Sequence, residues 1–224
     1  MKRRVFAAGR KPTIIITAGP TRERLDPVRF ISNYSTGEFG YALAREALKR
    51  GLKTVLISGP TAIAAPRGAE LIKIESAADM RKALRGEIKR ADYLIMAAAV
   101  SDWRAALPSS GKIKKTGRGI AIKLKENPDI LAETVRRKRR GAVIAGFALE
   151  TGGLERNALL KLKNKCLDLI VANRVSAGSS AFGHNNTNII IMDRLGNREK
   201  HGGRSKAALS KIILDRVLRF NIYF

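Results

Sequence analysis

Short apolar runs alternate along this chain with longer stretches in which apolar residues recur at helical spacing. The runs are continuous and rich in Ile, Val and Leu, as in strands that are covered on both faces. They predict strands over 13–17, 54–58, 71–74, 93–98, 142–147, 169–172 and 188–192. The longer stretches predict helices over 38–50, 77–88, 129–137, 154–164 and 205–220.

Residues at the ends of these stretches support the helices. Ser76 is placed to cap the second helix, Pro128 fits a first helical turn, and Gly51 follows the first helix as a terminating glycine. Strands that alternate with helices predict an α/β fold, a Rossmann-like, doubly wound, mostly parallel sheet with helices on both faces. We expect one domain over 1–224, with a flexible basic segment at 1–11 and a small extra strand region at 188–200.

Two regions interrupt the alternation of strands and helices. Pro, Ser and Gly residues over 103–118 predict a mobile loop, and the apolar residues that follow predict an added strand over 120–124. A second polar loop, rich in Ser, Gly and Asn, is expected over 176–186.

The composition fits a folded protein that stays out of the membrane. Apolar residues make up 45% of the 224 residues, which is enough for a core, and no apolar run approaches the roughly 18 residues of a membrane span. The single cysteine, Cys166, excludes an internal disulfide, and we expect a buried thiol in a reducing, cytoplasmic compartment. His184 and His201 lie in expected polar loops and support neither a hydrolytic triad nor a metal site.

The formal net charge of +25 is high. It is compatible with a nucleic-acid partner, with a site for polyanionic small molecules, or with a source organism whose proteins are generally basic. The charges are spread along the chain, apart from a dense run over 136–140, and aromatic residues are only 5% and do not interleave with that run. Stacking on single-stranded bases is therefore disfavoured, and a nucleic-acid-binding module is the weakest alternative.

The stretch over 17–40 is the strongest candidate for chemistry. It runs from the first strand through a long loop to a helix start rich in Gly, Ser and Thr, where free backbone N–H groups favour an anion such as phosphate. Gly37 and Gly40 form half of a dinucleotide-binding fingerprint, without the full GxGxxG pattern or an acid after the second strand. Tight packing of helix on strand is the other explanation of these glycines. An NAD(P)-dependent oxidoreductase is accordingly the nearest alternative function.

Further candidates follow later strands, at the end of an open α/β sheet where ligands bind. Three alanines over 97–99 precede Asp102, which could accept hydrogen bonds from hydroxyl groups or cap a helix. Phe147 ends another strand, as a surface for a base or as a core residue, and Asn173 follows the next.

Lysines form the last candidate group. Lys112, Lys114 and Lys115 lie in the expected mobile loop, and a closing loop with lysines suits a transferring phosphoryl group whose charge grows in the transition state. Lys161 and Lys165 lie four residues apart and share one helix face, which is either part of the site or merely solvated.

Seven motifs follow one another along the chain: TAGPTR (17–22), DPVRFISN (26–33), AAAVSD (97–102), KIKK (112–115), NPDIL (127–131), GFA (146–148) and DLIVAN (168–173). In this order they resemble the phosphopantothenoylcysteine synthetase family, in register over nearly the whole chain after Lys11. In many bacteria that enzyme is the C-terminal half of a bifunctional coenzyme A biosynthesis flavoprotein. The resemblance implies a single ligase domain that activates the carboxylate of 4′-phosphopantothenate with CTP or ATP, as an acyl-nucleotidylate, and then forms an amide with L-cysteine.

The resemblance also implies residue roles. Asn33 and Lys112 would be catalytic, and Asp102 would bind either ribose or pantothenate. Glu38 stands where family members commonly have a lysine, and it places a negative charge beside the expected phosphate site. The nucleotide would contact Gly19, Ser35, Gly37, Gly40, Met96, Ala97, Ala98, Asp102, Lys112, Pro128, Asp129, Ile130, Leu131, Phe147, Lys161 and Lys165, and the acyl substrate would contact Arg29, Asn33, Ala98, Ala99, Asp102 and Asn173.

Cofactors and partners are implied in the same way. Mg²⁺ would accompany the triphosphate without a dedicated metal site, CTP is favoured over ATP, and no flavin is expected. The enzyme would be a homodimer in which Arg29 reaches into the partner's site to hold the substrate phosphate. The flavin-binding decarboxylase half is missing from this sequence, which implies a separate decarboxylase protein in the pathway.

Overall fold

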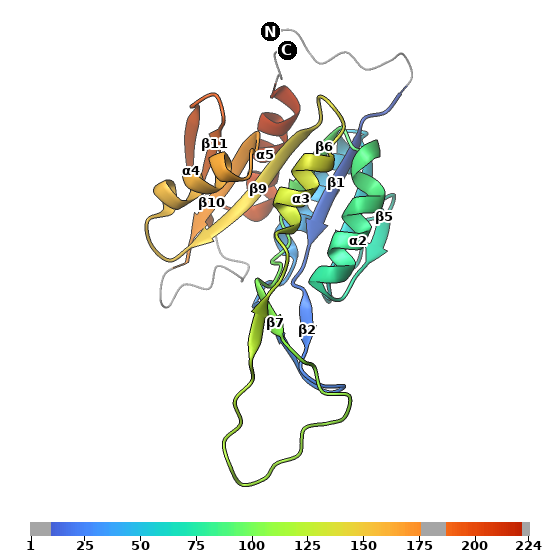
Figure 1. Ribbon diagram of the computed structural model, residues 1–224. Helices are drawn as coiled ribbons and strands as arrows, with labels where there is room; N and C mark the ends of the chain where they lie inside the picture. Colours follow the sequence, from blue (N-terminus) through green and yellow to red (C-terminus); the bar gives the residue numbers. More distant parts are fainter. Residues whose placement is uncertain (1–9, 176–186, 221–224) are drawn as a thin grey trace.

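The computed structural model describes residues 10–175 and 187–220. A central sheet of eight strands has the order β12-β11-β10-β9-β6-β1-β4-β5 (Figure 1). Its strands are β1 (Thr13–Ala18), β4 (Lys53–Ser58), β5 (Glu70–Lys73), β6 (Tyr93–Met96), β9 (Val143–Glu150), β10 (Leu169–Arg174), β11 (Thr187–Asp193) and β12 (Arg198–Arg204).

The strand directions confirm the doubly wound, mostly parallel sheet. From β5 to β10 every neighbouring pair is parallel, whereas β11 and β12 pair antiparallel at one edge. From β1 at the centre, β4 and β5 follow toward one edge of the sheet. β6 then lies on the other side of β1, and β9 to β12 follow in order toward the opposite edge. The antiparallel pair is the small extra strand region expected over 188–200, although β12 itself was not predicted.

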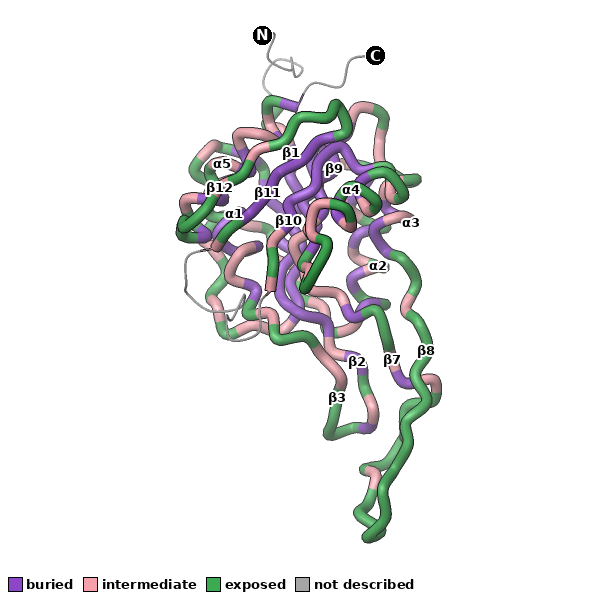
Figure 2. Tube along the Cα trace, turned by 90° about the vertical axis from the view of Figure 1, so that its left-hand side faces the viewer, coloured by how far each residue is buried: buried purple, intermediate pink, exposed green. Residues whose placement is uncertain are grey.

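Helices cover both faces of the sheet, as the continuous apolar strands predicted. On one face α1 and α5 pack over Ile14 and Ile16, and on the other α2, α3 and α4 pack over Ile15 (Figures 1 and 2). Successive residues of β1 therefore serve two separate cores, and all three isoleucines are fully buried. The helices are α1 (Glu38–Lys49), α2 (Ala77–Glu87), a 3₁₀ turn (Ile88–Arg90), α3 (Ile130–Arg137), α4 (Leu154–Asn164) and α5 (Lys206–Arg219).

Helix ends follow the sequence signals with one exception. Ser76 and Asp79 form a capping box at the start of α2, and Gly51 has a φ of 75° directly after α1. The exception is the start of α3, where Asp129 is the N-cap and accepts a hydrogen bond from the Ala132 N–H at 3.0 Å. Pro128 therefore precedes the helix and does not occupy its first turn.

Several strand predictions need correction. β6 ends at Met96, so the alanines at 97 and 98 lie in the following loop. The strand expected over 120–124 is instead β8 (Leu124–Glu126), and it pairs with β7 (Trp103–Ala105), which lies inside the expected mobile loop. β2 (Arg22–Arg24) and β3 (Phe30–Ser32) form an unpredicted hairpin. The polar loop expected over 176–186 lies outside the described residues.

These two hairpins project from the body, and we call residues 22–32 and 103–126 the arm (Figures 1 and 2). The arm is anchored where β2 meets the start of α2. There the buried Glu23 accepts a hydrogen bond from the Ala77 N–H at 2.8 Å, and the Arg22 N–H donates to the Glu75 carbonyl at 2.7 Å. The carboxylate thus caps a helix N-terminus and fixes the base of the arm.

Two further expectations from the sequence are wrong. Cys166 is exposed, with a φ of 49° just beyond α4, and is not a buried thiol. His201 lies in β12 and not in a loop, and His184 lies outside the described residues.

Candidate functional site

The site lies where the order of strands reverses, between β1 and β6. The loops that leave these two strands run side by side, because Pro20 and Ala99 form a parallel bridge beyond the sheet. The Ala99 N–H donates to the Gly19 carbonyl at 2.9 Å, and the Thr21 N–H donates to the Ala99 carbonyl at 3.2 Å. In open α/β sheets, ligands bind at such a switch point beyond the carboxyl ends of the strands.

The glycines around this point serve close backbone packing. Gly19 and Gly37 have φ values of 73° and 80°, and a Cβ on Gly37 would lie 3.1 Å from the Gly19 nitrogen. A Cβ on Gly40 would lie 2.5 Å from the Ala18 Cβ, so Gly40 lets α1 pack directly on β1. Neither Gly19 nor Gly40 lines the two cavities described below, whereas Gly37 does.

One cavity, of about 370 Å³, opens beside the start of α3, and we call it the α3 cavity. Asn127 joins the segment before α3 to the loop after β6 and so fixes two walls of this cavity. Its side-chain amide donates to the Ser101 carbonyl at 2.9 Å, and its backbone N–H donates to the Asp102 carbonyl at 2.7 Å. Its lining residues are Met96, Ala98, Val100, Ser101, Asp102, Trp103, Glu126, Asn127, Pro128, Asp129, Ile130, Leu131, Phe147, Lys161 and Lys165.

A second cavity, of about 350 Å³, opens at the start of α1, and we call it the α1 cavity. Asn33 is fixed on its wall because the side-chain amide donates to the Ala99 carbonyl at 2.9 Å. Its lining residues are Asn33, Ser35, Thr36, Gly37, Glu38, Phe39, Ala97, Ala98, Ala99, Val100, Asp102, Phe147, Ala148, Leu149, Lys161, Asn173 and Lys206.

The two cavities share a wall, formed by Ala98, Val100, Asp102, Phe147 and Lys161. The Lys161 Nζ donates to the Phe147 carbonyl at 2.7 Å, which fixes the ammonium group at the boundary. Burial lowers the pKa of Lys161, and repulsion from Lys165 lowers it further. An ammonium that is short of solvation at a shared wall is a strong contact for an anionic ligand.

The Lys165 ammonium lies at the α3 cavity, where it pairs with Asp129 at 3.1 Å. Burial of Asp129 opposes ionisation, but the hydrogen bond from the Ala132 N–H and the contact with Lys165 lower its pKa overall. Asp129 therefore remains ionised at neutral pH and orders the lysine beside the start of α3.

The structure brings together most of the residues that the sequence singled out. The α3 cavity collects those from strand β6 and from the start of α3, and the α1 cavity collects Asn33, Ser35, Gly37 and Asn173. Sequence reasoning missed Lys206, the first residue of α5, because no local pattern shows that α5 begins beside α1.

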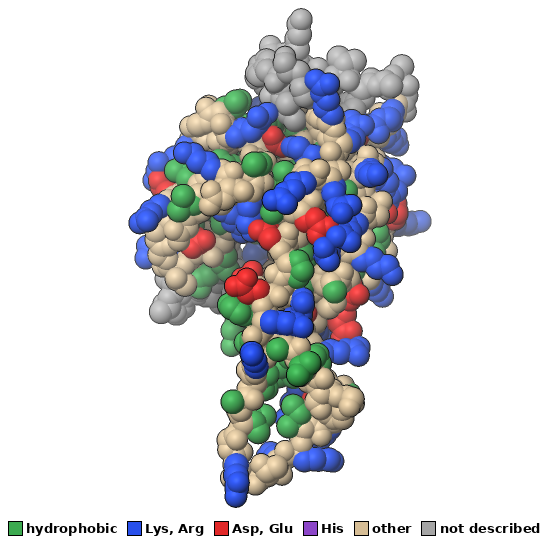
Figure 3. Space-filling model, in the orientation of Figure 1, with side chains coloured by type: hydrophobic (Ala, Val, Ile, Leu, Met, Phe, Trp, Pro, Cys, Tyr) green, Lys and Arg blue, Asp and Glu red, His purple; other side chains and the backbone are tan. Residues whose placement is uncertain are grey.

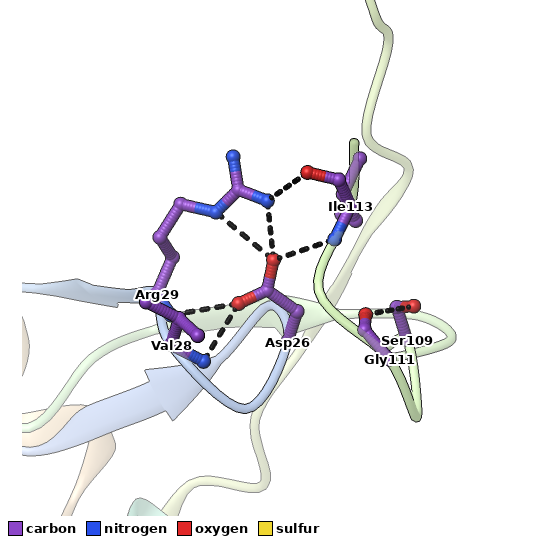
Figure 4. A network of polar contacts seen from close by, with 6 residues as sticks. All are labelled: Asp26, Val28, Arg29, Ser109, Gly111 and Ile113. Atoms are coloured by element: carbon purple, nitrogen blue, oxygen red, sulfur yellow. Dashed lines mark hydrogen bonds and ion pairs between the residues drawn. The ribbon is translucent and has the colours of Figure 1, made fainter. Parts of the chain in front are cut away.

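Arg29 and Lys112 lie on the arm, outside the linings of both cavities. The Asp26 carboxylate accepts hydrogen bonds from the Arg29 side chain and from the backbone N–H groups of Val28 and Ile113, and Arg29 donates to the Ile113 carbonyl at 2.7 Å (Figure 4). The bonds from Arg29 and from these backbone groups lower the pKa of Asp26 far below its usual range, although burial opposes them. This cluster, which we call the clasp, holds the loop of Lys112 to the β2–β3 hairpin.

Positive charge does not gather into a single patch on the face that Figure 3 draws. On the face drawn in Figure 3, Lys and Arg side chains are spread over the body and the arm. Within residues 10–175 and 187–220, no group of three or more His, Cys, Asp or Glu side chains is placed to hold a metal ion. In the same part of the chain, no helix combines the length and the apolar character needed to cross a bilayer.

Together the sheet and its cavities define an α/β protein of the Rossmann-like type with two adjoining cavities at its switch point. The chain belongs to the family described as DNA/pantothenate metabolism flavoprotein C-terminal domain, which matches residues 9–220. It is similar to the coenzyme A biosynthesis bifunctional protein CoaBC of Bacillus subtilis (strain 168), with 42% identity over 91% of this chain and 50% of the relative. The chain thus spans about half the length of the curated relatives it matches.

Solved structures show the same fold. The crystal structure of the C-terminal domain of a CoaBC protein matches with a TM-score of 0.78 at 31% identity, over 92% of this chain and 94% of that one. Cab2 mutant H337A, in complex with phosphopantothenate-cysteine, matches with a TM-score of 0.73 at 17% identity, over 92% of this chain and 85% of that one. The second likeness is a likeness of fold alone.

Proposed function

We propose that this chain joins 4′-phosphopantothenate to L-cysteine at the expense of a nucleoside triphosphate. The observation that carries the proposal is the pair of cavities that meet at Asp102, Phe147 and Lys161, in a chain of this family. A ligase of this kind must hold a nucleotide and an acyl substrate with their reacting atoms together, and a shared wall provides that arrangement. The relatives named for coenzyme A biosynthesis, at 42% and 38% identity, support the same pathway.

The proposed reaction has two steps. A carboxylate oxygen of 4′-phosphopantothenate attacks the α-phosphorus of the nucleotide, and pyrophosphate leaves with the electrons of the broken P–O bond. The amine of cysteine, after losing a proton, attacks the activated carbonyl, and the nucleoside monophosphate leaves as the amide forms. Negative charge gathers on phosphate oxygens in the first step, so fixed lysines near the shared wall stabilise its transition state.

In this scheme the α3 cavity receives the base and sugar of the nucleotide. Residues 128–131 line this cavity, and their backbone groups would contact the edge of the base, which is where a pocket can distinguish cytosine from adenine. Lys161 and Lys165 face the phosphates, and Phe147 offers an apolar surface between the cavities. We favour CTP over ATP because the motifs over 112–115 and 128–130 resemble those of bacterial members of the family.

The α1 cavity receives the acyl substrate and part of the phosphate chain. Asn33 lies on its wall with the backbone of the 97–99 loop, where the acyl carbonyl would be held. Lys112 would join the site when its loop closes, since it is exposed on the arm, which projects from the body. Asp102 lines both cavities, so the choice between ribose and pantothenate stays open for it.

Mg²⁺ would enter bound to the triphosphate. The exposed Asp102 carboxylate on the shared wall is an oxygen ligand of the kind that Mg²⁺ uses together with substrate phosphates and water. The ion would supply charge neutralisation, while the residues of this chain bind and orient the two substrates. No step of this ligation uses a flavin.

We also propose a homodimer that forms through the arm. Val28, Phe30, Leu107 and Ile120 are exposed on it by 60%, 45%, 91% and 56%, an unusual concentration of apolar surface for a projecting element. A second copy of this chain is the occupant that also explains Arg29, which lies outside the cavities of its own chain. In the dimer Arg29 would contact the phosphate of the acyl substrate in the partner's site.

A pyrophosphate-release assay tests the proposal. Release should require 4′-phosphopantothenate and a nucleoside triphosphate, should be greater with CTP than with ATP, and should give the amide product only when cysteine is added. Thermal stabilisation by CTP, ATP, NADPH and a DNA oligomer, measured in parallel, separates the competing functions. Stabilisation by NADPH alone, with no pyrophosphate released, would exclude the ligase.

A further inference from the structure

A buried lysine faces a carboxylate inside the α1 cavity. Lys206 is the first residue of α5, and its side chain is only 7% exposed. Its Nζ lies 2.6 Å from Oε2 of Glu38, the first residue of α1, whose side chain is 22% exposed. Both residues line the α1 cavity with Lys161, although they are far apart in the sequence.

The position of Lys206 is fixed by the packing of its helix. Ser205 caps α5 by accepting a hydrogen bond from the Ala208 N–H at 3.2 Å, and the Ser210 hydroxyl donates to the Lys206 carbonyl at 2.7 Å. Leu209 and Ile213 on the same helix are buried in the core that α1 and α5 share. The ammonium group therefore stays where the two helices begin, with little freedom to move toward solvent.

A cation held in this way needs an anion. Burying a charge without a counter-ion is costly, so Glu38 stabilises the unliganded cavity by neutralising Lys206. Of the two side chains Glu38 is the more exposed, and its flexible stem can turn the carboxylate outward, whereas Lys206 cannot follow it. A ligand anion that enters the cavity can therefore replace the carboxylate without moving the lysine.

We infer that Lys206 is a phosphate-binding residue of the α1 cavity and that Glu38 is the counter-ion which a bound phosphate displaces. The inference rests on the proposed function, in which the nucleotide and 4′-phosphopantothenate both bring phosphate to this site. Lys206 and Lys161 then contact the ligand from two sides of one cavity. Glu38 competes with the ligand, so it sets how tightly phosphate is held and how readily it leaves.

Substitutions of the two partners should act in opposite directions. Lys206→Met should raise the KM of the substrate whose phosphate it contacts by about tenfold or more, the usual effect of losing one charge-assisted hydrogen bond. Glu38→Gln should lower the same KM severalfold, because the competing carboxylate is gone. Lys211→Met, an exposed lysine on the same helix, is the matched control and should change neither.

The alternative is an ion pair that only joins α1 to α5. It predicts that both substitutions lower the thermal midpoint and shift KM in the same direction, or not at all, and that result would overturn the inference. Glu38→Gln keeps the shape of the side chain and so remains informative even where Lys206→Met fails to fold. Separate KM measurements for the nucleotide and for the phosphorylated acyl substrate identify which phosphate Lys206 contacts.

A binding measurement keeps the inference independent of catalysis. Inorganic tripolyphosphate and orthophosphate should raise the thermal midpoint of the wild-type protein, more strongly for Glu38→Gln and less for Lys206→Met. If the wild type releases no pyrophosphate but shows this order, the proposed function fails while the phosphate site stands. If it is an active ligase and the three proteins respond alike, the phosphate site fails while the function stands.

Discussion

Lys161 stands at the one place where both cavities meet, and its ionisation links the site to pH. Its pKa lies below that of a solvated lysine, first because of burial and then because of Lys165. The protonated form is therefore lost at a lower pH than for an exposed lysine. Bound phosphates would favour the protonated form, so nucleotide binding should be linked to this proton.

We predict that nucleotide affinity falls as pH rises through the lowered pKa of Lys161, by up to about tenfold per pH unit. Lys161→Arg keeps a charge throughout, because a guanidinium stays protonated, and should move this loss to higher pH. Dissociation constants for CTP across an alkaline pH series measure the effect. Lys163→Arg, at an exposed position on the same helix, is the control. An identical loss of CTP affinity at alkaline pH in the wild type and both variants would show that the proton on Lys161 does not control nucleotide binding.

Lys112 presents the opposite case, a residue predicted to be catalytic that lies outside both cavities. Lys112→Ala should lower turnover by roughly a hundredfold, as expected for the loss of one stabilising contact in a transition state. The fold should be unchanged because the residue is exposed, so the thermal midpoint should match the wild type. Lys123→Ala, also exposed on the arm, is the control. Wild-type turnover in Lys112→Ala would remove this residue from the mechanism.

At the scale of elements, the clasp decides where the loop of Lys112 can lie. Asp26 is inaccessible to solvent and bonds to Arg29, Val28 and Ile113, so one carboxylate joins both hairpins of the arm. Because its pKa is depressed, the clasp contributes stability above the ordinary pKa of an aspartate, about 3.9. That contribution is lost as pH falls from this value toward the lower pKa of the folded protein.

Asp26→Asn should therefore release the loop at neutral pH without unfolding the body. Trypsin should cut severalfold faster after the lysines over 112–115, while the central sheet keeps its thermal midpoint. Glu126→Gln, an exposed carboxylate on β8, is the control for a change of charge on the arm. Unchanged cleavage in Asp26→Asn would show that other contacts hold the loop.

The elements show which physical signals a sequence carries. Strands of the sheet core were predictable because they are continuous apolar runs, and the ends of β1, β6, β9 and β10 then located most of the candidate site. β2, β3 and β7 were missed, and β8 was expected a few residues too early, because each is only three residues long and none is a continuous buried apolar run. β12 was missed because its residues are largely charged, as suits an edge strand. These short strands and β12 form only when they pair with a neighbouring strand, and local sequence patterns do not show that pairing.

For the whole molecule, the sequence could predict a phosphate site but not which distant side chains complete it. The pairing of Lys206 with Glu38 depends on the packing of α5 beside α1, two helices that are separated by most of the sequence. The proposed role of Arg29 likewise depends on a contact that local sequence does not show, in this case one with a second chain. Its side chain is 45% exposed, and Figure 4 shows one guanidinium nitrogen with no contact to the residues drawn. The arm therefore has a donor available for a neighbouring molecule.

The dimer can first be tested by its state of association. Leu107→Asp places a charge on the most exposed apolar residue of the arm, and it should convert a dimer to a monomer in light scattering after size-exclusion chromatography. Ligase activity should fall with it while the thermal midpoint of the body is kept. Lys123→Asp is the control for a new acid on the same hairpin. A wild-type protein that is a monomer at assay concentration would exclude the arm as a dimer surface.

Mixing two inactive variants then shows whether Arg29 acts across the interface. In a dimer of Arg29→Ala with Asn33→Ala, the first chain keeps its own Asn33 and receives Arg29 from its partner, so one of the two sites is complete. Random exchange makes about half of the molecules such mixed dimers, and about a quarter of wild-type activity should return, as two-fold symmetry requires. If Arg29 serves the site of its own chain, each site in the mixed dimer lacks one residue. Activity would then stay at the level of the separate variants, because no exchange could assemble a complete site.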